Sequence, residues 1–479
     1  MGDPVPISLG FRTNKARNQQ GGNAQLINCY AEEIGQDGKV TIAIYATEGE
    51  QTFGSELVGG GIRAIFEVEE DENVIVVAGG NVYRVNSSGV GTLLGGLVTT
   101  GPVYMARNRK VPTQVGIVSD GLYYVIDTTS YSMTQIVDPD LPSPISIDVS
   151  DGYGIIPVVN GEFYLTGIDG LTTIDGLDVG TAEAYPDEIV RNLVIERELI
   201  LFGTRSIEWH QNTGNADFPY ERVHAIEIGC LAGNSVAKVD TPIRKTAIWV
   251  CPDHTVRMLN GYGADVISDN GMHELIKTLD RAGRASELRG MAWAYGGLFF
   301  YALTCDDWTR VFDSKTDNWH TRKSYGDDRW RINAISRLGN KLIGGHFDRG
   351  QLYSLDTSFR DAAGEYQVMD VITPTISAFP HALKFNGLYL DAATGVGLNS
   401  TDPHESDPKV LVSWSDDGGA SWAAEYERSM GTDGKITDIK PIYRMGKCRD
   451  KGRMYRFRIS APVERVMLQA SIDYDQLTA

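Results

Sequence analysis

The sequence lacks the features that mark membrane-anchored, secreted and disulfide-linked proteins. It has no long, uninterrupted apolar run, so we expect neither a transmembrane helix nor a membrane anchor. The N-terminal segment has no basic stretch followed by an apolar one, so we expect no secretory signal. The five cysteines are scattered, odd in number and without CxxC spacing, which favours small buried side chains in a reducing compartment over disulfides or a zinc site.

The short motifs of most enzyme classes are also missing. The eight histidines show no HExxH or other metal-ligand spacing, and the chain has neither a GxSxG motif nor a complete P-loop. We therefore predict no catalytic residue, no cofactor and no metal site.

Positive charge is in short supply. The 44 lysines and arginines are outnumbered by 63 aspartates and glutamates, which gives a formal net charge of −19. This balance argues against a protein that holds nucleic acid on a broad basic face. It is compatible with a channel through which DNA slides, because a repelling or neutral wall lets the anionic duplex pass without adhering.

Turns between short strands are abundant instead, in keeping with 53 glycines. The stretch LVIERELILFGTRSIEW (193–209) has two apolar runs, a turn at Gly203 and an alternating run, which predicts an antiparallel hairpin. Similar hairpin cues recur along the chain at Gly80, Gly121, Gly161, Gly203, Asp253, Asp307 and Gly350.

The spacing of these cues predicts a repeated unit. The first four are 41, 40 and 42 residues apart, and a period of roughly 40 to 45 residues with several short strands is typical of four-stranded propeller blades. One blade cannot bury both faces of its sheet, so the units must stack around an axis. We predict an all-β protein in which residues 56–360 form a β-propeller of six or seven blades, preceded by an N-terminal arm and first strands at 1–55.

Two departures from the repeat are expected. The apolar residues of MHELIKTL (272–279) follow helical spacing, and Asp269 or Asn270 can cap this segment, so we predict one inserted helix. After about residue 360 the period is lost and longer alternating strands follow. Residues 361–479 are therefore expected to form a C-terminal β-sandwich-like domain.

The segment SDDGGASW (415–422) matches the Asp-box pattern of sialidase-type propellers. We expect a turn in which Asp417 accepts backbone N–H groups, Gly419 has a positive φ and Trp422 packs beneath. A glycosidase would also need paired carboxylates or an activated tyrosine, together with an arginine cluster, and these cannot be assigned. A glycan-binding or sialidase-like propeller enzyme is the alternative function.

Two groups of cations are candidate contact sites. Between residues 440 and 458, eight lysines and arginines accompany one acidic residue, which indicates either a solvated basic strand face or a docking surface. Its partner would be an acidic protein, such as another subunit of this chain, or DNA phosphate. Three cations at 107–110 form a second candidate, or a solvated loop. The candidate interface residues are Arg107, Arg109, Lys110, Lys447, Arg449, Lys451 and Arg453.

Collinear segments over nearly the full length carry a resemblance to a known family. They are INCYAEE, YATEGEQTFG, GPVYMARNRKVPTQVGIVSDG, EIVRNLVIERELILFGTRSIEWHQNTG with IEIGCLAG, DVISDNGMHELI with ELRGMAWAYGGLFFYAL, and IYRMGKCRDKGRMYRFRIS with PVERVMLQASID. In these segments the chain resembles the tail-hub proteins of short-tailed bacteriophages (podoviruses), also described as packaged-DNA stabilisation or tail accessory proteins.

The resemblance implies a structural virion protein that is not an enzyme, located in the virion tail and assembled in the cytoplasm of the host bacterium. Proteins of this family look like propellers that form a homohexameric ring below the portal and its adaptor ring. The ring closes the portal channel after DNA packaging, retains the genome, and anchors the tail needle and the receptor-binding tailspikes. Double-stranded DNA passes through it at ejection. The alternatives are a glycan-binding or sialidase-like enzyme of a phage tail, and a kelch- or WD-like interaction scaffold.

Overall fold

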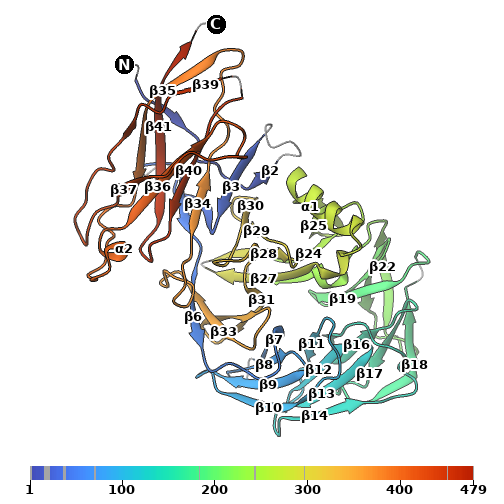
Figure 1. Cartoon of the computed structure of the whole chain (residues 1–479). Helices are drawn as coiled ribbons and strands as arrows, with labels where there is room; N and C mark the ends of the chain where they lie inside the picture. The colour runs from blue at the N-terminus through green and yellow to red at the C-terminus, as the bar shows by residue number, and fades with distance from the viewer. Residues whose placement is uncertain are drawn as a thin grey trace.

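Two β units, a propeller and a sandwich, make up the computed structural model of the chain, and the N-terminal strands contribute to both (Figure 1). The structure describes residues 3–15, 22–35, 39–68, 72–182, 184–241, 244–295, 297–449 and 451–477.

Within these ranges the propeller consists of six separate four-stranded sheets and a seventh four-stranded unit that continues into a larger sheet. The prediction of an all-β propeller with six or seven blades is therefore confirmed, and strand pairing gives seven units. Blades one to three contain β7 (Ile62–Val68), β8 (Asn73–Ala78), β9 (Asn81–Asn86), β10 (Gly91–Gly96), β11 (Tyr104–Arg107), β12 (Gln114–Ser119), β13 (Leu122–Asp127), β14 (Ser132–Ile136), β15 (Asp148–Ser150), β16 (Tyr153–Pro157), β17 (Glu162–Thr166) and β18 (Ile174–Thr181).

The later blades repeat the same antiparallel order from the axis outward. Blades four to six contain β19 (Ile189–Ile195), β20 (Glu198–Gly203), β21 (Ile207–Asn212), β22 (Tyr220–Ile226), β23 (Ala237–Asp240), β24 (Lys245–Val250), β25 (Val256–Asn260), β26 (Gly263–Val266), β27 (Arg289–Tyr295), β28 (Leu298–Thr304), β29 (Thr309–Asp313) and β30 (Asn318–Thr321).

The seventh blade combines strands from the two ends of the propeller sequence. Its first three strands, counted from the axis, are β31 (Ile332–Leu338), β32 (Lys341–His346) and β33 (Leu352–Asp356). Its outermost strand, β6 (Gly49–Phe53), precedes the first blade in sequence. β33 pairs antiparallel with β6, and β31 lies against β7 of the first blade. This pairing ties the end of the repeat to its beginning.

All seven predicted hairpin cues fall at the same place in their blades, at the turn between the second and third strands. The middle strands are the most apolar because the neighbouring blades cover both faces of each sheet. In β8 every residue from Asn73 to Ala78 is buried. Repeating this arrangement gives several interblade clusters in place of one central core.

The inserted helix is confirmed as α1 (Asn270–Arg281), which lies between the fifth and sixth blades. Asp269 is the N-cap and accepts a hydrogen bond from the backbone N–H of Met272 at 2.9 Å. Met272, Ile276 and Leu279 are buried against those two blades. The insertion accounts for the wider spacing between the cues on either side of it.

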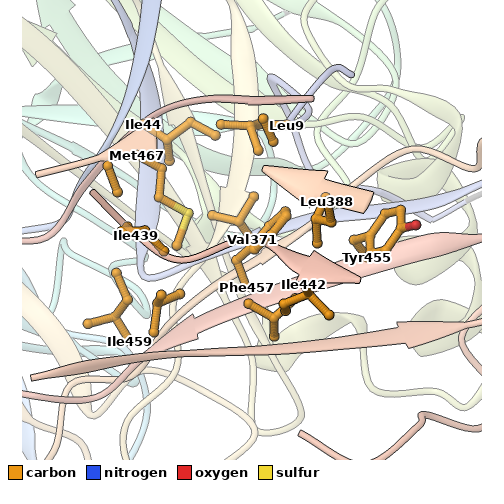
Figure 2. Close-up of a cluster of buried hydrophobic side chains, with 14 of the residues drawn as sticks. Leu9, Ile44, Val371, Leu388, Ile439, Ile442, Tyr455, Phe457, Ile459 and Met467 are labelled. Carbon is orange, nitrogen blue, oxygen red and sulfur yellow. The ribbon is translucent and has the colours of Figure 1, made fainter. Parts of the chain in front are cut away.

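The C-terminal β-sandwich is likewise confirmed, and its two sheets enclose one core. One sheet has the order β38-β35-β41-β5-β4, with β1 and β39 at its margins; the other contains β3, β34, β40, β36 and β37, with β2 paired to β3. Figure 2 shows the apolar side chains of this core, including Val371, Phe457 and Met467. The strands are β1 (Val5–Ile7), β2 (Asn14–Lys15), β3 (Asn23–Ile27), β4 (Cys29–Glu33), β5 (Ile42–Ala46), β34 (Met369–Ile372), β35 (Ala382–Ala392), β36 (Lys409–Ser415), β37 (Tyr426–Ser429), β38 (Ile442–Tyr443), β39 (Lys447–Cys448), β40 (Met454–Ile459) and β41 (Val466–Leu477).

The N-terminal strands are shared between the two units. β1, β3, β4 and β5 pair inside the sandwich, whereas β6 belongs to the propeller. The domain limits 1–55, 56–360 and 361–479 stay a prediction. A one-turn helix, α2 (Pro403–Ser406), lies within the sandwich, in a segment with no predicted regular structure.

Candidate interaction surfaces

The described side chains do not assemble a centre for metal chemistry. Among those residues there is no cluster of three or more His, Cys, Asp or Glu side chains that could hold a metal ion. No helix in the described ranges is long and apolar enough to cross a membrane. The five cysteines are free and buried. Burial raises the pKa of Cys251 to about 12 and that of Cys305 to about 11, so these thiols stay protonated and unreactive at neutral pH.

The Asp-box forms the turn that its sequence predicts, but it connects β36 and β37 of the sandwich and does not lie in a propeller blade. Asp417 accepts hydrogen bonds from the backbone N–H and the hydroxyl of Ser421, and these bonds hold the pKa of its carboxyl well below the usual range. Gly419 has a φ of +94°. Every one of these contacts serves the turn.

The first predicted cation group lies in the second blade, at the connection between β11 and β12. Arg107 ends β11 and is half-buried, whereas Arg109 and Lys110 are exposed in the loop. Asn108 beside them is buried, and its amide donates to the carbonyl of Asp169 in the third blade at 3.4 Å. The two exposed cations are thus presented from an anchored loop, next to a segment rich in carboxylates.

The second predicted group lies on the sandwich. Lys447 is part of β39, where it pairs with Lys384 of β35, and Arg449 and Lys451 follow it. All three side chains are exposed, and in the described part of the chain none is in an ion pair. We call these three residues the basic tip. In Figure 1, β39 lies at the far end of the sandwich and β11 lies in the propeller, so the two groups do not form one surface.

Arg453 does not join the basic tip. Its side chain is 1% exposed, and its guanidinium donates two hydrogen bonds of 2.7 Å to the carboxylate of Asp416. A third bond reaches the carbonyl of Met445, and the ring centroids of Phe385 and Trp414 lie 4.5 and 5.3 Å from the guanidinium carbon. Since its donors point inward, Arg453 stabilises the sandwich and presents no charge to a partner in this conformation.

The sequence also contains a long acidic segment, which is a second charge asymmetry beside the basic run at 440–458. Residues 111–190 contain 13 aspartates and glutamates and no lysine, arginine or histidine. This segment forms most of blades two and three. A long stretch without compensating charge concentrates the negative field of the chain on one part of the propeller.

Part of this negative charge lies at the outer edge of the third blade. Asp140 is close to the backbone of Gly176 in β18, and Glu162 accepts a hydrogen bond from the Tyr164 hydroxyl at 3.1 Å. Burial and then the nearby carboxylate of Glu162 raise the pKa of Tyr164. We call the carboxylates at this edge the acidic rim: Asp138, Asp140, Glu162, Asp175 and Asp178.

The acidic rim also exposes apolar side chains. Val137 precedes one of its carboxylates and is 83% exposed, and Leu177 lies between two of them on β18 and is 85% exposed. Large apolar groups framed by charge are more typical of a contact surface than of a bare solvated face.

The described residues thus combine a β-propeller with a β-sandwich, and most of the predicted interface cations lie on exposed surfaces. The family profile described as bacteriophage P22 Gp10, beta-propeller, matches residues 36–360, and the profile described as bacteriophage P22 Gp10, beta-sandwich, matches residues 369–475. The chain therefore belongs to the Gp10 family of phage structural tail proteins, and the predicted family is confirmed.

Other comparisons add little. No curated protein matches the chain. The solved structure of the computationally designed Ika8 protein aligns with 64% of this chain and 100% of its own at 12% identity, with a TM-score of 0.40. This score is too low to support a conclusion about fold or function.

Proposed function

We propose that the protein is the hub and plug of a short phage tail: a ring that closes the portal channel after packaging, retains the genome and opens for ejection. The observation that carries this proposal is the family match, because it covers both the propeller and the sandwich in their chain order. Such a role is mechanical. It requires a rigid body with several contact surfaces and no catalytic group.

The separate charged surfaces support a ring. A surface that binds a different surface on the next copy gives a head-to-tail interface, and such interfaces close into rings when the rotation fits. In our proposal the basic tip of one copy, formed by Lys447, Arg449 and Lys451, contacts the acidic rim of its neighbour. We propose a homohexamer on the basis of the family resemblance.

Other partners would occupy the remaining surfaces. We propose that the ring meets the portal-adaptor ring on one side, and the tail needle and tailspikes on the other. Arg107, Arg109 and Lys110 are proposed as a second contact site, distinct from the subunit interface. The protein would assemble in the host bacterial cytoplasm, and double-stranded DNA would pass it only transiently.

Electron cryo-microscopy of the intact tail tests the assembly directly. The proposal expects six copies of the propeller–sandwich unit in a ring below the adaptor, with β39 of each copy near β18 of the next. A reconstruction in which the protein is absent from the channel, and decorates only peripheral fibres, would contradict the hub assignment.

A further inference from the structure

Three side chains from the inner strands of alternate blades converge on the propeller axis. Tyr104 begins β11 in blade two, Arg191 is the third residue of β19 in blade four, and Arg289 begins β27 in blade six. Each lies at the start of its inner strand, so all three are at the same end of the axis. The inner strands surround this centre in Figure 1.

The contact between blades two and four shows that the side chains reach the axis. The guanidinium carbon of Arg191 lies 3.7 Å from the centroid of the Tyr104 ring, although blade three separates their blades. The charge of Arg289 acts on Tyr104 as well, and it opposes the rise in the pKa of that phenol that burial produces. All three residues are half-buried, so the cluster is neither sealed nor fully open to solvent.

Arg191 is unusual in its hydrogen bonding. Its Nε and Nη1 atoms are buried, and neither has a hydrogen-bond partner among the described residues. The nearby carboxylate of Asp148 is already used, because it accepts the backbone N–H groups of Val149 and Val194. Buried N–H donors without a hydrogen-bond partner are costly and rare in folded proteins.

Two neighbouring arginines at the same end of the propeller show what a purely structural arginine looks like here. Arg63 donates to the carbonyls of Gly79, Thr99 and Gly101 and so joins blades one and two. Arg329 donates to the carbonyl of Trp330, among other acceptors. Both side chains have their donors occupied by protein groups, unlike Arg191.

Arg289 also has donors to spare. Within the described ranges its side chain makes no hydrogen bond and no ion pair. The carboxylate of Asp306, which acts electrostatically on Arg289, is paired with Arg329 at 3.2 Å. The Arg191 guanidinium and the Tyr104 ring therefore meet at the axis, the Arg289 charge acts on the same phenol, and the carboxylates of Asp148 and Asp306 are engaged elsewhere.

We propose that Arg191, Arg289 and Tyr104 form an axial site for an oxyanion, carried by a phosphate or a carboxylate group. Guanidinium N–H groups match the paired oxygens of such anions, and charge-assisted hydrogen bonds are stronger where water is partly excluded. The anion would complete the hydrogen bonding of Arg191 and bridge blades four and six across the axis. Binding would therefore stabilise the folded propeller.

Calorimetric titration of the full-length protein tests this site, with inorganic phosphate and with acetate as probes at constant ionic strength. Saturable binding of phosphate with no binding of acetate identifies a phosphate source, whereas binding or competition by acetate identifies a carboxylate source. Either result supports the site. The absence of saturable binding by both probes overturns it.

Matched variants separate this site from general charge effects. Arg191→Met and Arg289→Gln should each weaken binding at least tenfold, and Arg197→Gln, which removes an exposed charge from the same blade as Arg191, should leave it unchanged. If Arg191→Met fails to fold, the half-exposed Arg289→Gln variant gives the same test. Equal loss of binding in Arg197→Gln and Arg289→Gln would contradict a specific site.

Thermal unfolding gives a second readout. Without anion, Arg191→Met should unfold at the same temperature as the unmodified protein or higher, because it removes two buried N–H donors that have no hydrogen-bond partner. With phosphate, only the unmodified protein and Arg197→Gln should gain stability. A phosphate-dependent gain that persists in Arg191→Met would place the anion elsewhere.

Discussion

Arg322 and Glu48 form a buried ion pair at the junction of the propeller and the sandwich. Two hydrogen bonds, of 2.9 and 2.8 Å, join the guanidinium to the carboxylate, and the side chains are 1% and 3% exposed. The rings of Trp293 and Trp330 lie over the same guanidinium. Because Glu48 lies between strands of the sandwich and of blade seven, the pair holds both units in one geometry.

Removing one partner of this pair should be costly. We expect Arg322→Met to lower the free energy of unfolding by about 3 to 5 kcal/mol, because the Glu48 carboxylate would be left buried without its partner. Denaturant titration of the purified protein measures the change. Lys315→Met removes the exposed partner of Glu32 and should cost less than about 1 kcal/mol. Similar losses for the two variants would contradict a structural role for the buried pair.

Stability should fall below pH 6.5 in part through His346. Burial, and then the nearby Arg349 and Arg331, lowers the pKa of His346 from 6.5 to about 4. The unfolded chain therefore takes up a proton before the folded one does. The contribution of His346 to the free energy of unfolding is present in full above pH 6.5 and is lost as the pH falls towards 4. At pH 4.5 this loss amounts to about 2 to 3 kcal/mol.

His346→Asn isolates this effect. The Nδ1 of His346 accepts the backbone N–H of Asp348 at 3.0 Å, and the asparagine carbonyl oxygen can replace this acceptor without titrating. Between pH 7 and 4.5 the variant should lose about 2 to 3 kcal/mol less than the unmodified protein in denaturant titrations. Parallel losses in the two proteins would show that His346 is not a source of the pH dependence.

Closure of the propeller by β6 should be sensitive to one methyl group. A Cβ added at Gly49 would lie 2.5 Å from the carbonyl oxygen of Phe359, so the backbone must shift. We expect Gly49→Ala to cost about 1 to 3 kcal/mol, measured by thermal or denaturant unfolding. Gly96→Ala, on the outer strand of blade one, places its Cβ at an ordinary 3.7 Å from the nearest backbone atom and should have little effect. Equal effects would remove the steric explanation.

Subunit contacts through the basic tip should respond to charge reversal. K447E/R449E/K451E should prevent assembly onto DNA-filled heads, and K238E/R244E/K245E, which changes an equal number of exposed cations in blade five, should not. Co-sedimentation with heads measures assembly. If the acidic rim is the partner, mixing the tip variant with a D175K/D178K variant should restore part of the assembly, because the reversed tip of one chain then meets a reversed rim on the other. Normal assembly of the tip variant would exclude this interface.

Local patterns in the sequence predicted most of the fold. Each blade repeats one turn between two strands, so the cues from Gly80 to Gly350 could be recognised without knowing what packs against them. The helix at 270–281 was predictable for the same reason, since its cap at Asp269 and its apolar spacing are local. The division of the N-terminal strands between two units was not, because β6 pairs with β33, which lies about three hundred residues later, and no local signal encodes this pairing.

The contact surfaces were harder to predict. Arg453 and Lys451 belong to the same basic run, yet one is buried against Asp416 and the other is exposed, and only the fold distinguishes them. The acidic segment at 111–190 could have been found by counting charges over a longer window. The axial cluster could not, because Tyr104 and Arg191 are distant in sequence and meet only after blades two and four close around the axis.

The DNA content of heads assembled without this protein tests the central claim most directly. The hub and plug account predicts heads that package a full genome and then lose it, with retention restored by adding the purified protein. Heads that keep their DNA and fail only to adsorb to the host would contradict the plug and move the function to host recognition.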